Sequence, residues 1–138
     1  MPVTRFQDAD FGDEIDPFAP DIRLTTVRQF TDVTGMSFGR FTDHDEARKM
    51  GLPGAIVPGI MSQGIFAAMI HGWAPGATIL KLDTIFRAPL VADSKATCTG
   101  VVTDLDEEAH TVELDVTLAN EKAETVVLGT AIVQLAAE

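Results

Sequence analysis

The sequence contains few side chains that could transfer a proton, and its three histidines lie far apart. Asp43 and His44 are adjacent, and a carboxylate beside an imidazole is a pair that general acid–base catalysis can use. Asp43 also begins an Asp-x-x-Glu pattern typical of a helix start, so a capping role is favoured for it. His44 would then begin a surface helix and point to solvent. We expect His71 to be partly buried at a helix end and His110 to be exposed beside an acidic turn.

Composition excludes several other kinds of chemistry. Lys and Arg total 10 against 21 Asp and Glu, and the resulting net charge of -11 argues against a nucleic-acid or anionic membrane surface. Cys98 is the only cysteine, so an intrachain disulfide and a cysteine-based metal site are excluded. The histidines do not have metal-ligand spacing. We therefore expect neither a metal nor a resident cofactor.

The chain is expected to form one domain, residues 1–138, in the cytoplasm. Its first 16 residues are polar and acidic, unlike a signal peptide. Residues 51–80 lack charged side chains, but three prolines and several glycines interrupt them. This segment therefore predicts a helix buried within the protein and not a membrane span.

Three helices are predicted in the first half of the chain. Thr26 and Gln29 have the spacing of a capping box, and Gly35 is a typical helix terminator, so residues 26–34 should form the first. Residues 36–42 show no period and are predicted to be a loop. A helix of about two turns should run from Asp43 to Gly51. Residues 58–73 are apolar on nearly every face and predict a buried central helix.

After residue 76 the hydrophobic period changes from 3.6 to 2, which indicates strands. Short turns between successive strands favour an antiparallel sheet. One apolar helix followed by such a sheet predicts an α+β hotdog fold, in which the sheet wraps the helix, and an exposed sheet edge would favour dimerisation. The residues expected on the inner face are Leu80, Leu82, Thr84 and Phe86; Ala96, Cys98, Gly100 and Val102; Val112, Leu114, Val116 and Leu118; and Val126, Leu128, Thr130 and Ile132.

Four segments carry a resemblance to a known family. They are Phe6-Gln-Asp with Phe11-Gly-Asp-Glu, the run from Gly51 to Met61, the strand end Ile85-Phe-Arg-Ala-Pro-Leu90, and Gly129-Thr-Ala-Ile-Val133. In order and spacing they resemble the MaoC-like (R)-specific enoyl-thioester hydratases and 3-hydroxyacyl-thioester dehydratases. The resemblance covers nearly the whole chain and implies the hotdog fold and an acyl thioester, such as acyl-CoA, as ligand.

That family uses an Asp-x-Asn-Pro-x-His motif, whose Asp and His activate the water that adds to the thioester. In this sequence Met36 stands at the Asp position and Phe41 at the His position, with Phe38 and Gly39 at the Asn and Pro positions. Neither Met nor Phe can transfer a proton, so the resemblance implies that the usual catalytic pair is absent.

The resemblance also implies which binding residues survive. The family polarises the thioester carbonyl with a backbone N–H at the start of the central helix, and Gly59 matches that position. Helix N-termini offer unpaired donors in any case, although Gly59 could equally serve only close packing. Arg40 could contact a CoA phosphate or lie free in solvent. Phe38 and Phe41 are further candidates for the binding site, and Met36, Phe38, Phe41, Phe66 and Met69 could line an apolar tunnel or pack in the core.

Three functions are weighed. The first is a non-catalytic, acyl-CoA-binding subunit that works beside an active MaoC-like subunit. The second is a homodimeric hydratase or dehydratase with a relocated acid and base, for which Asp43 and His44 are the candidates. A hotdog thioesterase is the third, but residues 51–80 contain no carboxylate, which leaves only Asp32 and Asp43 nearby.

Overall fold

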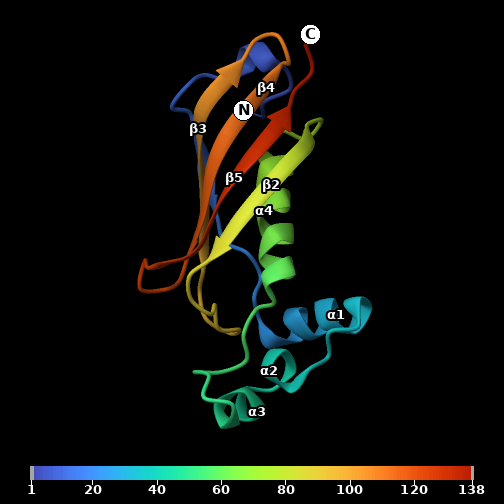
Figure 1. The fold of residues 1–138 in the computed structure, drawn as a ribbon, viewed down its shortest axis with the longest axis vertical. Coiled ribbons are helices and arrows are strands. Elements are labelled where there is room, and N and C mark those ends of the chain that lie inside the picture. Colours follow the sequence, from blue (N-terminus) through green and yellow to red (C-terminus); the bar gives the residue numbers. More distant parts are fainter. Residues whose placement is uncertain (1, 138) are drawn as a thin grey trace.

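The computed structural model describes residues 2–137, and its centre is a five-stranded antiparallel sheet (Figure 1). The strand order is β1-β3-β4-β5-β2, so β1 and β2 form the two edges. The elements are a 3-10 helix (Phe6–Asp8), β1 (Glu14–Phe18), α1 (Leu24–Thr34), α2 (Gly39–Thr42), α3 (His44–Lys49), α4 (Gly59–Trp73), β2 (Thr78–Phe86), β3 (Thr97–Asp106), β4 (Thr111–Ala119) and β5 (Thr125–Gln134).

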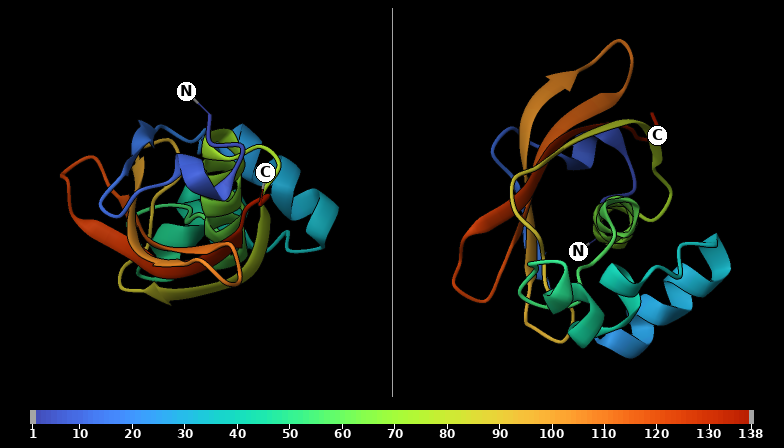
Figure 2. Two further views of the ribbon diagram at one scale, coloured as in Figure 1. Left: turned by 90° about the horizontal axis from the view of Figure 1, so that it is seen from above. Right: turned by 60° about the horizontal axis from the view of Figure 1, so that its bottom comes forward.

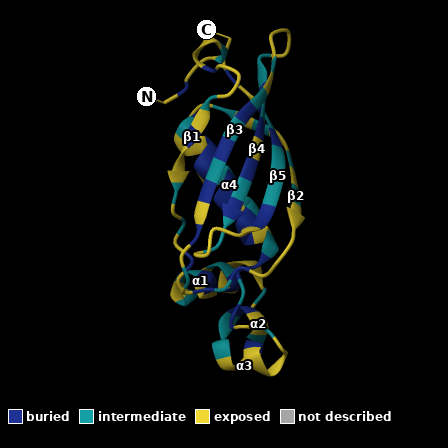
Figure 3. Ribbon diagram, turned by 90° about the vertical axis from the view of Figure 1, so that its left-hand side faces the viewer, coloured by how far each residue is buried: buried dark blue, intermediate teal, exposed yellow. Residues whose placement is uncertain are grey.

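The curved sheet wraps around α4, as the predicted hotdog fold requires (Figure 2). Phe66 and Ile70 on α4 and Leu114 and Leu118 on β4 are fully buried in one hydrophobic core, because the helix and the inner face of the sheet are both apolar. Phe66 and Met69 are therefore core residues, and packing explains them without a ligand. Buried residues follow α4 and the central strands, while exposed residues mark the edges and α3 (Figure 3).

The inner faces of β3 and β4 are confirmed as predicted, but that of β5 is wrong. Cross-strand partners share a face, and β4 pairs Val116 with Gly129 and Leu114 with Ala131. The inward row of β5 therefore consists of Val127, Gly129, Ala131 and Val133, one residue out of phase with the prediction. In β2 a register shift next to Lys81 leaves Leu80 exposed, and Phe86 is exposed at the sheet edge.

The helices before α4 form an overhang, residues 24–49, at the lower end of the molecule in Figure 1. Gly35 ends α1 in the left-handed conformation, as predicted. The predicted start of α1 at Thr26 is wrong, because the helix begins at Leu24. The Thr26 hydroxyl does not cap the helix and donates a hydrogen bond to the Asp21 carboxylate. The predicted loop 36–42 contains a short helix, α2, because Phe38 and Gly39 carbonyls accept bonds from Phe41 and Asp43.

No helix among residues 2–137 has both the length and the apolar character that a membrane crossing demands.

Candidate functional site

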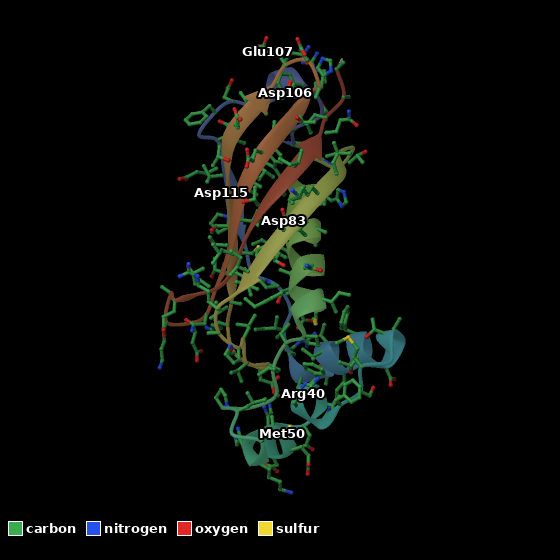
Figure 4. All side chains as sticks on the ribbon, viewed as in Figure 1. Arg40, Met50, Asp83, Asp106, Glu107 and Asp115 are labelled. Carbon is green, nitrogen blue, oxygen red and sulfur yellow. The ribbon has the colours of Figure 1, made fainter. Side chains whose placement is uncertain are left out.

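The segment from Met36 to Phe41, where the sequence predicted a degenerate motif, makes apolar and cation–π contacts. Met36 is half-buried, and Phe41 is buried with a side chain only 7% exposed. The Arg40 guanidinium lies over both aromatic rings, 4.8 Å from the centroid of Phe41 and 5.5 Å from that of Phe38. The structure thus brings Phe38, Arg40 and Phe41 together on α2, with Arg40 at the lower end of the molecule in Figure 4.

The same loop supports the chain that leads into α4. The Arg40 carbonyl accepts a hydrogen bond of 2.9 Å from the N–H of Ile56, three residues before Gly59. A backbone hydrogen bond therefore joins α2 to the segment that leads into α4, and the Arg40 side chain is left for other contacts.

Asp43 is a helix cap, as predicted. It precedes α3 with extended backbone angles, and its side chain accepts a 3.0 Å hydrogen bond from the N–H of Glu46. That bond lowers the pKa of Asp43 below its ordinary value. A carboxylate committed to a backbone N–H in this way favours a structural role.

His44 does not point to solvent, contrary to the prediction. Its Nδ1 accepts a 3.0 Å bond from the N–H of Ala55, and its Nε2 lies 2.8 Å from Asp93 Oδ2. An N–H can only donate, so Nδ1 is unprotonated and Nε2 carries the hydrogen given to Asp93. Both ring nitrogens are occupied, and the missed contact lies 49 residues away in the sequence, where no local pattern could reveal it.

Asp93, the partner of His44, lies in a segment that connects two strands of the sheet. It lies in the turn between β2 and β3 with a φ of 66°, and its Oδ1 accepts a 2.8 Å bond from the N–H of Leu24. Hydrogen bonds from His44 and from Leu24 lower its pKa. One side chain therefore caps α1 and fixes α3, which explains why α1 begins before the predicted Thr26.

We expect His44→Ala to destabilise the fold by about 1–3 kcal/mol, because it leaves the buried N–H of Ala55 without an acceptor. Chemical denaturation followed by circular dichroism measures this loss. Asp45→Ala is the matched control, since Asp45 lies on the same helix and makes only an exposed pair with Arg48. An equal effect from the two changes would contradict the role assigned to His44.

A pocket of about 470 Å³ opens at the start of α4. Its wall is mostly apolar, and it also includes Gly59, Ser62 and Arg87. The residue before Gly59 is Pro58, which provides no side-chain cap. Among residues 2–137 the N–H groups of Gly59 and Ile60 have no acceptor, so the helix start presents free donors here.

Gly59 is required for the shape of this pocket. A Cβ at this position would lie 3.0 Å from Cζ of Phe86, closer than side chains normally approach. Close packing, one of the two roles considered for Gly59, is thus real, and the pocket beside it makes carbonyl binding possible as well. Ser62 was overlooked in the sequence; the available signal was a hydroxyl on an otherwise apolar helix.

The remaining sequence candidates lie elsewhere. Asp32 is exposed on α1, and His71 is exposed where partial burial was expected, because α4 ends at the molecular surface. His110 is half-buried where exposure was expected, because its ring meets the edge of Phe6 at 5.6 Å. Over the described part of the chain, no three His, Cys, Asp or Glu side chains gather as a metal site would need.

Solved structures with the same architecture are numerous. An (R)-hydratase from A. caviae involved in PHA biosynthesis superposes with a TM-score of 0.88 at 19% identity, over 94% of this chain and 98% of that one. The ChsH1-ChsH2 complex from Mycobacterium tuberculosis gives 0.84 at 18% identity, over 92% and 98%. The HadBC (3R-hydroxyacyl-ACP dehydratase) complex from the same organism gives 0.73 at 13%, over 90% and 96%.

No family model matches the sequence, and no curated protein matches it significantly. At these identities the structural likeness establishes the fold: the chain is an α+β hotdog protein. The proteins that share this architecture include (R)-hydratases and MaoC-like dehydratases.

Proposed function

We propose that this chain is an acyl-CoA-binding hotdog protein of the MaoC-like hydratase and dehydratase family, and that it serves as the non-catalytic subunit of a heteromeric enoyl-CoA hydratase in the cytoplasm. The observation that carries the proposal is the contrast between two parts of the site. The start of α4 keeps free backbone donors beside a pocket, while the family resemblance puts Met36 and Phe41, which cannot transfer a proton, at the positions of the acid–base pair.

Recognition of CoA is supported by the distribution of cations. Five of the ten Lys and Arg residues lie between residues 23 and 50, although the protein as a whole is strongly acidic. Within the described range Arg40 forms no ion pair and is held by aromatic rings alone. A guanidinium presented in this way suits a phosphate group of CoA.

The free edge of β2 supports an oligomer. Large apolar side chains are exposed on this strand and at the start of α4: Leu80 is 54% exposed, Ile85 59%, Phe86 53% and Ile60 55%. An unpaired edge with apolar side chains is a surface that a second hotdog chain can cover. Two of the structures with the same fold, ChsH1-ChsH2 and HadBC, are complexes.

The first experiment measures hydration of crotonyl-CoA and of a longer enoyl-CoA by the purified chain, through the loss of enoyl absorbance. General acid–base groups typically contribute on the order of 10² to 10⁴ in rate, so no turnover above background is expected. Binding of the same thioesters, measured by calorimetry, should persist. Rapid turnover by the chain alone would contradict the assignment as a non-catalytic subunit.

A second arm tests the partner. A small hotdog protein with an intact Asp-x-Asn-Pro-x-His motif, encoded beside this chain, should co-purify with it and should hydrate enoyl-CoA faster in the complex than alone. The alternative of a homodimeric hydratase with a relocated base is less well supported, because His44 has no free ring nitrogen and Asp43 caps α3.

A further inference from the structure

Ser62 and Gln63 are neighbouring polar residues of α4 with different surroundings. The Gln63 side-chain amide donates a 3.0 Å hydrogen bond to the Thr84 hydroxyl on β2. Ser62 is only 2% exposed, and its hydroxyl forms no hydrogen bond with any of the described residues. The carbonyl of Pro58, the usual acceptor for a helical serine at this distance, already accepts bonds from the N–H groups of Met61 and Ser62.

The Ser62 hydroxyl opens onto the pocket at the start of α4. Among residues 2–137 no fully enclosed side-chain oxygen or nitrogen lacks a partner, so the unpartnered Ser62 oxygen must reach open space. The space available to it is the pocket that Ser62 and Gly59 line together. In that space a ligand or water can make the hydrogen bond that no protein acceptor makes with this hydroxyl.

Helix geometry places this hydroxyl near the free backbone donors. Side chains on an α-helix lean toward its N-terminus, and residues three apart lie on one face. Ser62 therefore leans toward the turn that begins at Gly59, where the absence of a side chain leaves room. Gly59 and Ser62 both line one pocket, whose other walls, such as Val57 and Leu90, are apolar.

We propose that Ser62 is a ligand-binding residue that donates a hydrogen bond to the thioester carbonyl oxygen, beside the backbone N–H of Gly59. This inference rests on the proposed acyl-CoA binding and adds to it a residue that fixes the orientation of the carbonyl. A carbonyl oxygen has two lone pairs and can accept both donors at once. Ser62 contributes only a hydrogen bond, and no covalent step is involved.

The test compares two ligands that differ only in the carbonyl. Butyryl-CoA contains it, whereas S-butyl-CoA, a thioether, lacks it. Ser62→Ala should weaken butyryl-CoA binding roughly three- to tenfold, the value of one hydrogen bond, and leave S-butyl-CoA binding unchanged. Gln63→Ala is the matched control, because it removes a polar side chain from the same turn that bonds to Thr84 and does not line the pocket.

A spectroscopic measurement separates carbonyl binding from an effect on shape. In the infrared spectrum of butyryl-CoA labelled with ¹³C at the carbonyl, the stretching frequency should fall on binding to the parent chain and rise again in Ser62→Ala. Equal weakening of both ligands, or an unchanged frequency, would overturn the role of Ser62 while leaving acyl-CoA binding in place. Failure of the parent chain to bind butyryl-CoA would overturn the proposed function and this inference together.

Discussion

Gly59→Val is expected to reduce acyl-CoA binding below detection while the fold persists. The valine methyl groups would lie beside the free N–H of Gly59, in the pocket that Gly59 lines. A thioester carbonyl could then no longer approach this donor, because backbone donors act only at hydrogen-bonding distance. Calorimetric titration with butyryl-CoA measures the loss.

The fold should tolerate this change because the side chain in the way can move. The atoms nearest to a Cβ at position 59 belong to the Phe86 ring, at 3.0 to 3.5 Å, and Phe86 is 53% exposed at the sheet edge. Gly59 is also the first residue of α4. The far-ultraviolet circular dichroism and the melting temperature should therefore change little.

Gly72→Val is the control for Gly59→Val. Gly72 lies on the same helix, and a Cβ there would meet nothing within 4 Å. The Gly72→Val variant should bind butyryl-CoA with the same affinity as the parent chain. If Gly59→Val folds and retains the parent affinity, Gly59 does not belong to the binding site.

Restoring the family motif is expected to create hydratase activity. The variant combines Met36→Asp, Phe38→Asn, Gly39→Pro and Phe41→His. The backbone suits the middle pair, and a Cβ at position 39, 3.1 Å from Cβ of Glu46, requires Glu46 to shift slightly. Phe38 is the N-cap of α2, a position where Asn is among the preferred residues, and Gly39 is its first residue, where Pro is favoured. Crotonyl-CoA hydration should rise on the order of 10²-fold above the parent chain.

The cost of the restored motif falls on stability. Phe41 is 7% exposed and supports the Arg40 guanidinium, so a histidine there removes apolar contacts from the overhang. Phe38→Asn with Gly39→Pro alone is the control, since it keeps α2 but supplies no acid or base. A quadruple variant that folds and binds crotonyl-CoA without hydrating it would show that positions 36 and 41 do not face the thioester.

The sheet shows where a hydrophobic period is sufficient and where it is not. In β4 the inward Leu114 and Val116 alternate with the polar Glu113 and Asp115, so the period identifies the buried face. In β5 both faces are largely apolar, and only pairing with β4 selects Gly129 and its row as the inner one. The hotdog architecture was predictable because it depends on the helix and on β3 and β4 more than on β5.

In the candidate site, too, local contacts were predictable from the sequence and long-range contacts were not. Asp43 was predictable as a cap because its partner, Glu46, lies three residues away. The contact of His44 with Asp93 spans 49 residues, and that of Leu24 with Asp93 spans 69, so neither leaves a local pattern. That Ser62 lines the pocket became visible only in the structure, where its hydroxyl has no protein partner among the described residues.

The hydrogen bonds of Asp93 have a consequence for the local unfolding of α1 to α3. Its backbone N–H donates to Ile22, and its two carboxylate oxygens hold α1 and α3. Small helices at one end of a sheet that share an anchoring residue tend to open as a unit, at a lower free energy than the sheet itself. Amide hydrogen exchange should therefore give α1 to α3 one common protection level, distinct from that of β3 to β5, and Asp93→Ala should lower that level throughout the three helices.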